Sequence, residues 1–262
     1  LEKGGHTSMS GTSMASPHVA GIVALLLQAR PELKGHPQQV REVLQNTAGP
    51  AKFSFSPEAG HEMVVRQGAG MVNITRAVTA RQSVSPSKIS LGDQSRRPVT
   101  TTLKLHNDSK APVTYEISNL DGVGAHKPSN PKFDLLAARV KAPKSVTVRP
   151  GATKRIRVTI SAPADAPEGY VYGGWIVLNG DNGATMRVPY AGMAGDYQSL
   201  QTIQDNGNGF PWVARAKGQD FAKAEPNHRF TMQGDDVPFV LFHLEYPVSD
   251  VQLFIHLSLI HI

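Results

Sequence analysis

The sequence predicts a protein in two parts, a helical segment followed by an antiparallel β-sandwich. The chain has 262 residues, which is more than a single domain usually holds. Residues 14–81 carry helical patterns, whereas from about residue 84 to residue 190 short alternating runs are separated by turn residues. A hydrophobic content of 40%, with 24 glycines and 19 prolines, is typical of a β-rich globular protein.

Three helices are expected in the first part. The clearest covers residues 14–29, and its broadly apolar sequence predicts a core helix that starts near Ser13. Pro17 fits the first turn, where backbone N–H groups lack intrahelical partners, and it limits how far upstream a regular helix can extend. A second helix is predicted over residues 37–47 and a short third one over residues 74–81.

The second part contains seven short runs of alternating or β-branched residues. Each run predicts a strand, at residues 86–91, 99–105, 112–118, 144–149, 154–160, 171–178 and 184–190. Seven strands over about a hundred residues favour a sandwich of the immunoglobulin or fibronectin type III kind. The long connection at residues 119–143 is expected to cross between the sheets. Beyond Asp196 the chain is loop-rich, apart from two predicted strands at residues 237–244 and 251–255.

Composition excludes several classes of function. The formal net charge is +6, but Lys and Arg are scattered along the chain instead of gathering on one periodic face, and no stacking aromatics accompany them. We therefore expect no nucleic-acid partner. The longest apolar run, residues 19–27, is far shorter than the roughly 20 residues of a membrane span, so no membrane span is expected. The absence of cysteine excludes disulfides and thiolate metal sites.

No metal site is predicted from the carboxylates of the sandwich. Asp181, Asp196 and Glu168 fall in turns, where solvated carboxylates are far commoner than metal ligands. Two sequons, at Asn73 and Asn107, match the N-glycosylation pattern, and chance occurrence in a polar turn explains them equally well. Trp175 and Tyr172 are expected to pack a core or an interdomain face.

A stretch of small residues leads directly into the first helix, from Ser8 to Gly21 (SMSGTSMASPHVAG). A serine hydroxyl becomes a nucleophile when a neighbouring base takes its proton and hydrogen-bond donors receive the oxyanion. Ser13 would lie at the positive end of the helix dipole, close to unpaired backbone N–H groups, and Gly11 leaves room for a substrate backbone. Serine is also a favoured N-cap, so we expect Ser13 to be both cap and nucleophile in one arrangement.

Three segments resemble one family. The string from Gly11 to Gly21 (GTSMASPHVAG) resembles, without interruption, the nucleophile segment of the subtilisin-like serine proteases, the subtilases. Residues 67–73 (QGAGMVN), followed by Ala77, resemble the segment that leads into the last helix of a subtilase catalytic domain. Parts of the sandwich resemble the fibronectin-like domain of cell-envelope proteinases, C5a-peptidase-like enzymes and Vpr-like extracellular proteases, at residues 145–161, 173–177 and 189–196.

The resemblance implies a role for each residue of the motif. Ser13 matches the catalytic serine, and its own backbone N–H is one donor of the oxyanion hole. Gly11, Thr12 and Met14 flank the nucleophile, and Met14 matches a methionine whose sulfoxide would crowd the oxyanion site. His18 matches a structural histidine. Because it follows Ser13 by five residues on the same helix, we expect a satisfied core side chain that points away and not a general base.

The resemblance also implies a fold and a domain plan. The fold is α/β in the first part, as the C-terminal helical end of a subtilisin-like catalytic domain, followed by an all-β fibronectin III-like antiparallel sandwich. The expected parts are an incomplete catalytic domain at residues 1–82, the sandwich at residues 83–195 and a truncated segment at residues 196–262. The last six residues (LSLIHI) correspond to the translation of a common sequencing adapter and are expected to be adapter-derived.

The implied activity is that of a secreted serine endopeptidase. Its parent would be extracellular or cell-wall associated, in contact with the cell surface, and would hydrolyse protein or peptide substrates through an acyl-enzyme. The family orders its triad Asp, His, Ser, with an oxyanion-hole Asn between His and Ser, so these partners are expected before Leu1. The 262-residue piece alone is therefore expected to be inactive. No cofactor is visible, and calcium sites would lie in the missing part of the catalytic domain.

Two other readings compete with the protease. The first is a non-catalytic β-sandwich that serves as a binding or spacer module, which would leave Ser13 without a chemical role. The second is an α/β-hydrolase, whose nucleophile elbow has the pattern G-x-S-x-G. We discount the hydrolase because Ala15 stands at the position of the second glycine and no strand precedes Ser13.

Overall fold

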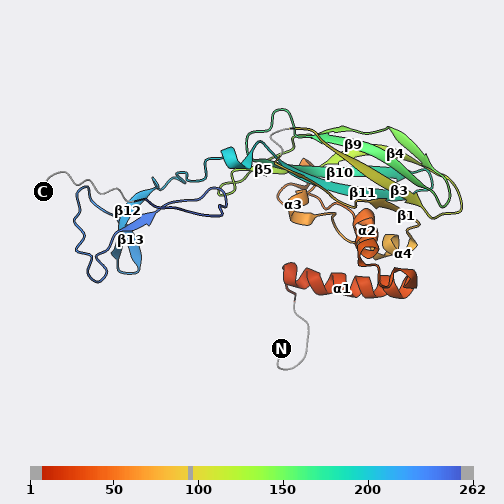
Figure 1. Cartoon of the computed structure of the whole chain (residues 1–262). Coiled ribbons are helices and arrows are strands. Elements are labelled where there is room, and N and C mark those ends of the chain that lie inside the picture. Colours follow the sequence, from red (N-terminus) through yellow and green to blue (C-terminus); the bar gives the residue numbers. More distant parts are fainter. Residues whose placement is uncertain (1–7, 94–96, 255–262) are drawn as a thin grey trace, which may run out of the picture. The chain divides into compact units, whose positions relative to one another are not determined.

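The computed structural model describes residues 8–93 and 97–254 of the chain. By contacts the chain divides into two compact units. The first unit comprises Leu1–His126 and Phe133–Tyr197, and the second comprises Lys127–Lys132 and Gln198–Ile262. The helical segment and the large sheets therefore belong to one unit (Figure 1).

The three predicted helices are confirmed, the second with its predicted limits and the other two with slightly altered ones. They are α1 (Thr12–Ala29), α2 (Pro37–Thr47) and α4 (Ile74–Thr79). Four short helices were not predicted: α3 (Val64–Gln67) and the 3₁₀ turns η1 (Pro31–Leu33), η2 (Pro57–Ala59) and η3 (Tyr197–Ser199). The clearest match is α2, where the predicted apolar face buries Val40 and Val43, in keeping with a strongly amphipathic sequence.

The prediction that the first helix is a core helix is wrong for this chain. Leu26 is the one residue of α1 that is fully buried, and it packs in a small cluster with Leu33, Val40, Val43 and Ala77. Other apolar residues of α1 face solvent, with Val19 42% and Leu25 54% exposed. The reason is that α2, α4 and η1 cover only one side of α1 in the described chain.

All seven predicted strands are present. They are β2 (Ile89–Gly92), β3 (Val99–Asn107), β4 (Val113–Asp121), β8 (Ser145–Val148), β9 (Thr153–Ser161), β10 (Tyr170–Gly180) and β11 (Thr185–Ala194). Four further strands were not predicted: β1 (Gln82–Ser85), β5 (Gly124–His126), β6 (Lys132–Asp134) and β7 (Arg139–Lys141). Each has only three or four residues, too few to show a clear alternation.

The strands form two sheets. One has the order β1-β3-β9-β7, and the main path of the other is β2-β11-β10-β4-β8. The connection after β4 visits the first sheet as β7 and returns to the second as β8, so the predicted crossing is confirmed. The prediction of a wholly antiparallel sandwich is wrong at one edge. There β2 pairs with β11 in parallel, because the chain leaves β1, crosses between the sheets at residues 86–88 and joins the open edge of β11.

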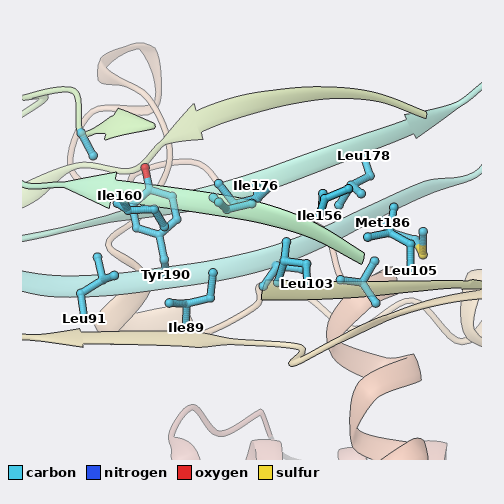
Figure 2. Packing of buried hydrophobic residues seen from close by; sticks show 14 of the residues in the cluster. Ile89, Leu91, Leu103, Leu105, Ile156, Ile160, Ile176, Leu178, Met186 and Tyr190 are labelled. Carbon is cyan, nitrogen blue, oxygen red and sulfur yellow. The ribbon is translucent and has the colours of Figure 1, made fainter. Parts of the chain in front are cut away.

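Apolar side chains from the two sheets meet in one core (Figure 2). Leu103, Leu105 and Ile156 point inward from the first sheet, and Ile176 and Leu178 point inward from the second. Along β3, exposed Lys104 lies between buried Leu103 and Leu105, as expected for a strand with one face in the core. Trp175 and Tyr172 are both buried, as predicted.

Asn107 holds the turn between β3 and β4. Its side chain is fully buried, and Nδ2 donates to the carbonyl oxygens of Ala111 (2.9 Å) and Val148 (3.0 Å). Its Oδ1 accepts from the backbone N–H and the hydroxyl of Ser109. The sequon at Asn107 is therefore inaccessible in the folded protein, and the sequon at Asn73 serves as the N-cap of α4.

Replacing Asn107 with alanine is expected to lower the free energy of unfolding by about 2–4 kcal/mol, because the buried carbonyl of Val148 and the partly buried carbonyl of Ala111 lose their donor. Denaturation followed by circular dichroism measures the loss. Asn182→Ala is the matched control, since Asn182 makes its one recorded side-chain bond in the exposed turn after β10. Equal losses in the two variants would show that the buried network around Asn107 is not what stabilises the turn.

The second unit contains a small antiparallel sheet with the order β13-β12-β14. The predicted strand at residues 237–244 is confirmed in shortened form as β14 (Phe239–Leu241), whereas β12 (Trp212–Lys217) and β13 (Asp220–Lys223) were missed. The strand predicted at residues 251–255 is wrong for residues 251–254, which pair with no strand in the described chain. Ile255 and the predicted adapter residues 257–262 lie outside the described residues.

Candidate active-site serine

Ser13 is the second residue of α1 and not its cap. The helix begins at Thr12, and the N-cap is Gly11, with a φ of 149° and no side-chain capping bond. Such a positive φ is easily adopted by glycine and costly for other residues. The prediction that Ser13 caps the helix is therefore wrong, because Gly11 makes the turn and leaves Ser13 with a helical backbone and an exposed side chain.

The first turn of α1 leaves backbone donors free beside Ser13. The N–H groups of Met14 and Ala15 both donate to the carbonyl of Gly11, at 3.1 and 3.2 Å. The N–H groups of Thr12 and Ser13 lie ahead of these bonds, at the end of the helix where no intrahelical acceptor exists and where the dipole is positive. In the described part of the chain the Ser13 hydroxyl has no hydrogen-bond partner.

Pro17 lies inside α1, five residues after its first residue. The helix starts at Thr12, close to the expected start near Ser13, and Pro17 has no N–H with which to form a helical hydrogen bond. The group that loses this bond is the carbonyl of Ser13, four residues earlier. The turn that carries Ser13 thus lacks the bond from residue 17, and its first regular i→i−4 bond runs from the N–H of Ala15 to the carbonyl of Gly11.

The residues that flank Ser13 take separate positions. Met14 is half-buried. Its sulfur would lie 3.6 Å from a Cβ placed on Gly11, so the Met14 side chain packs beside the N-cap residue. His18 is exposed, and its Nδ1 is hydrogen-bonded to the carbonyl oxygen of Met14 at 2.6 Å. The prediction of a satisfied side chain is confirmed, whereas its placement in a core is wrong for this chain.

The second motif supports the helix on which α1 packs. Gly70 has a φ of 113°, and a Cβ there would collide with the Gly49 backbone, which pairs with Met71. The chain then enters α4, where Oδ1 of Asn73 accepts from the N–H of Arg76 at 2.9 Å. Ala77 of α4 is fully buried in the cluster that contains Leu26 of α1. The two segments that resemble one family therefore meet in one small core.

Arg30, which belongs to none of the motifs in the sequence, stabilises the other end of α1. Its guanidinium donates to the carbonyl oxygens of Ala80 (3.1 Å) and Ala77 (3.5 Å), which end α4. Its Nε donates to the carboxylate of Glu32 at 2.9 Å. A cation at the C-terminal end of a helix is favourable, so Arg30 stabilises both α4 and the orientation of α1. A basic residue just after an apolar helix is a weak sequence signal that also fits an ordinary helix end.

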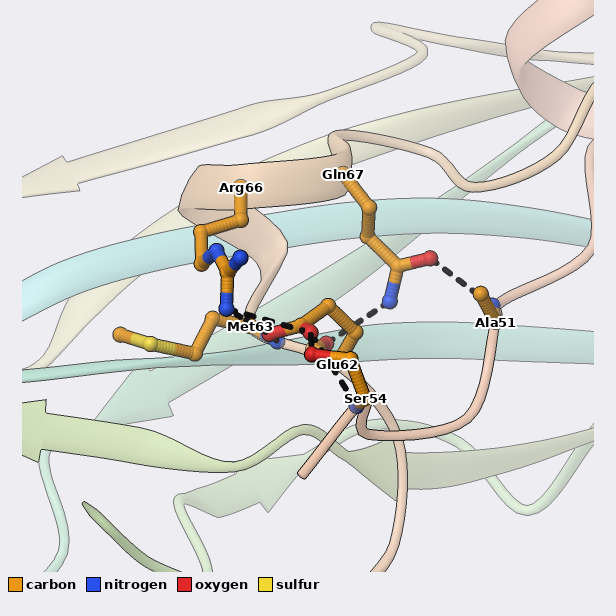
Figure 3. Close-up of polar contacts among 6 residues, drawn as sticks. All are labelled: Ala51, Ser54, Glu62, Met63, Arg66 and Gln67. Carbon is orange, nitrogen blue, oxygen red and sulfur yellow. Dashed lines mark hydrogen bonds and ion pairs between the residues drawn. The ribbon is translucent and has the colours of Figure 1, made fainter. Parts of the chain in front are cut away.

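Glu62 organises the loop between α2 and α3 (Figure 3). Its carboxylate is buried and accepts from the N–H of Met63 (2.9 Å) and the hydroxyl of Ser54 (2.9 Å), with Arg66 at 3.3 Å. Gln67 adds a second link, since its side chain donates to the Glu62 carbonyl and accepts from the N–H of Ala51. Burial alone raises the pKa of Glu62, but the bonds from Met63 and Ser54 and the charge of Arg66 outweigh it, so the pKa is lowered.

This lowered pKa predicts a pH-dependent contribution to stability. Because the carboxyl binds its proton less readily in the folded chain, Glu62 stabilises the fold above its unfolded pKa, and this stabilisation is lost as the pH falls through the folded pKa. Glu62→Gln is expected to lower the melting temperature at pH 7 and to have a much smaller effect at pH 3. The control is Glu116→Gln, which changes an exposed side chain of β4. An equal effect of Glu62→Gln at both pH values would contradict the prediction.

Two general properties concern cofactors and membranes. Within residues 8–93 and 97–254, no group of three His, Cys, Asp or Glu residues could hold a metal ion. By length and composition α1 is apolar enough to cross a membrane, with a mean hydropathy of 1.2 over 18 residues, so the expectation drawn from its shorter apolar run is too strict. Only 6% of this window is buried, at Leu26, through which α1 packs on α2, α4 and η1.

Comparisons with known proteins find similarities for both parts of the first unit. Residues 1–83 match the family model described as the subtilase family, and residues 89–191 match that of an Fn3-like domain. The PI-type proteinase of Lactococcus lactis subsp. cremoris is 29% identical over 242 residues, covering 79% of this chain and 12% of that protein. The minor extracellular protease Vpr of Bacillus subtilis is 27% identical, covering 71% of this chain and 21% of that protein.

A third relative shows a similar level of identity and coverage. The C5a peptidase of Streptococcus pyogenes is 28% identical over 232 residues, which covers 76% of this chain and 18% of that protein. The chain thus spans about a fifth or less of the length of these relatives.

Proposed function

The chain belongs to the subtilase family, with an Fn3-like domain after its protease segment, and from this premise we propose that it is part of a serine endopeptidase in which Ser13 is the nucleophile. The observation that carries the proposal is the position of Ser13. It is exposed at the positive end of α1, directly beside its own free N–H group, and within an unbroken motif. Gly11, Thr12 and Met14 shape the turn that holds it.

The arrangement suits acyl transfer. The Ser13 oxygen attacks the scissile carbonyl, the leaving amine departs to give an acyl-enzyme, and water then releases the acid. The oxyanion that forms in each step accepts a hydrogen bond from the Ser13 N–H, with the dipole of α1 favouring its charge. A base must take the proton of the hydroxyl, and no described residue is placed to do so. We propose that an Asp, a His and an oxyanion-hole Asn precede Leu1 in the longer protein.

The remaining parts of the proposal concern substrate and location. The substrates are proteins or peptides, and the parent acts outside the cell or at the cell wall, in line with its similarity to the minor extracellular protease Vpr. The proposed parts are the catalytic segment at residues 1–82, the Fn3-like sandwich at residues 83–195 and a further segment from residue 196. No cofactor is proposed for these residues, and calcium, if used, is assigned to the rest of the catalytic domain.

We propose that the Fn3-like sandwich braces the catalytic segment. Asn46 at the end of α2 receives a bond from the N–H of Val84 (2.8 Å) and donates to the carbonyl of Arg187 (3.3 Å), one residue in each sheet. Trp175 of β10 donates from Nε1 to the carbonyl of Ala69 at 3.2 Å. These buried contacts support a rigid connection and not a flexible tether.

A second candidate is a non-catalytic binding or spacer module, favoured by the isolation of the Ser13 hydroxyl in the described chain. A cleavage assay with a fluorescent protein substrate separates the two. We expect cleavage by the longer protein that extends the reading frame upstream and none by the 262-residue chain. An upstream reading frame that lacks Asp-Gly and His-Gly-Thr-like segments at subtilase spacing would overturn the protease proposal.

A further inference from the structure

Basic side chains gather on the outer face of the four-stranded sheet, the sheet with the order β1-β3-β9-β7. In the strand register Lys104 lies opposite Arg155, and Arg157 lies two residues further along β9 on the same face. On β7, Lys141 and Arg139 lie opposite Thr159 and Ser161, which continue this outward-facing row. We call these five residues the basic face: Lys104, Arg139, Lys141, Arg155 and Arg157.

The basic face is exposed and carries no opposing charge. All five side chains are exposed, and in the described part of the chain none of them forms an ion pair. The strands β1, β3, β7 and β9 contain no Asp or Glu at all. The sequence-based expectation that Lys and Arg stay scattered is therefore wrong. Residues from β3, β7 and β9, far apart in the chain, become neighbours through strand pairing (Figure 1).

The rest of this surface is rich in hydroxyl groups. Thr100 of β3 and Thr159 of β9 lie opposite each other on this face, and their hydroxyls are hydrogen-bonded to each other at 2.9 Å. None of the four strands contains Phe, Tyr or Trp, so the face offers no ring on which a base could stack. Acidic residues follow the strands, as Asp108 does after β3 and Asp165 after β9, and do not interrupt the face.

The spacing of the charges is regular. Side chains on one face of a strand repeat about every 6.6 Å, and neighbouring strands are separated by about 4.8 Å. Three of the five charges are guanidinium groups, which bind the oxygens of a phosphate through two parallel hydrogen bonds. A surface of this kind fits a linear polyanion that carries a phosphate on each repeat.

We propose that the basic face binds a linear polyol-phosphate polymer of the cell envelope, whose phosphodiesters pair with Arg155, Arg157 and Lys104. The choice of this source rests on the extracellular location in the proposed function, whereas the binding itself needs neither Ser13 nor peptide hydrolysis. Single-stranded nucleic acid fits less well because the face lacks stacking rings. A membrane fits less well because no exposed apolar side chain on these strands could insert into it.

The test measures binding of the full 262-residue chain to immobilised poly(glycerol phosphate). We expect salt-sensitive binding that weakens at least about tenfold in the triple variant Lys104→Ser, Arg155→Ser, Arg157→Ser, because each basic residue near an anionic surface adds several-fold in affinity. The control variant replaces three exposed basic residues elsewhere, Lys110, Lys144 and Arg149, with serine and loses the same charge. It is expected to bind nearly as well as the unaltered chain.

Every result of this binding test either supports or overturns the proposal. Binding that is lost in the triple variant and kept in the control supports the proposal, provided that both variants melt near the temperature of the unaltered chain. No binding, or equal binding by all three proteins, overturns it. Stronger binding to polygalacturonate, to an oligothymidylate or to phosphatidylglycerol vesicles overturns the choice of a phosphodiester polymer. Ser13→Ala is expected to bind normally, so a failure of the protease proposal would be seen separately.

Discussion

Replacing Ser13 with alanine in the longer protease is expected to lower kcat by about a million-fold, the size known for loss of the nucleophile in subtilisin. The KM for a peptide substrate is expected to change little. Without the hydroxyl no acyl-enzyme forms, and the remaining donors near the start of α1 stabilise only the direct attack of water. Because Ser13 is exposed and its hydroxyl makes no bond in the described chain, the fold is expected to be unaffected.

The matched control is Ser16→Ala, which removes another exposed hydroxyl from the first turns of the same helix. This variant is expected to keep kcat within a few-fold of the unaltered enzyme. Steady-state hydrolysis of one peptide by all three proteins makes the comparison. If Ser13→Ala retained more than about a thousandth of the activity, the proposed role of Ser13 as nucleophile would be untenable.

Replacing Trp175 with alanine is expected to destabilise the first unit by about 3–5 kcal/mol. The indole is fully buried, packs with Val64 and Val177, and lies edge-on to the ring of His61 at 6.1 Å. Its Nε1 also donates to the carbonyl of Ala69. Deletion of the ring leaves a large cavity and a carbonyl without its donor, at the place where the helical segment meets the sheet.

Two further variants separate the causes of this loss. Trp175→Phe keeps most of the apolar contact but not the hydrogen bond, so a loss of about 1–2 kcal/mol is expected. Trp212→Ala removes a half-buried indole from the second unit and is expected to leave the main unfolding transition of the first unit in place. Denaturant titrations measure all three. A loss below about 1 kcal/mol in Trp175→Ala would show that the helical segment is held mainly by other contacts.

Sequence patterns predicted those elements whose burial is local and periodic. The amphipathic α2 and the longer strands β3 and β9 have one face in a core and the other outside it, so the period of their apolar residues reveals them. β10 is buried on both faces, and its continuous apolar run reveals it instead. The short strands β5, β6 and β7 lack this signal. They exist because neighbouring backbone offers them hydrogen-bond partners, which no local pattern records.

The positions of these elements relative to one another could not be predicted from the sequence for a similar reason. The broad apolar surface of α1 predicts burial, but only the side around Leu26 finds a partner in the described chain. The charges of Arg139 and Arg155 lie sixteen positions apart in the chain, and only the pairing of β7 with β9 brings them to one face. Parallel pairing of β2 likewise depends on where an edge is open and not on its own residues.

The sequence predicts the chemistry of the candidate site but not the role of each residue at the start of the helix. The motif around Ser13 indicates the chemistry, since a fixed string of eleven residues carries far more information than a helix cap. The roles at the helix start were misassigned, because both serine and glycine are common there and only the backbone angle shows that Gly11 is the cap. Arg30 and Asn46 were missed because their partners lie far away in sequence.

Labelling of the longer protein with a fluorophosphonate, followed by mass analysis of its peptides, is the most direct test of Ser13 as the nucleophile. Such a reagent phosphonylates an activated serine and leaves an ordinary hydroxyl unmodified. We expect that the adduct lies on Ser13, that it disappears in Ser13→Ala and that it is absent from the 262-residue chain. Labelling that persists in Ser13→Ala, or an adduct on another serine, would contradict the assignment of Ser13 as the nucleophile.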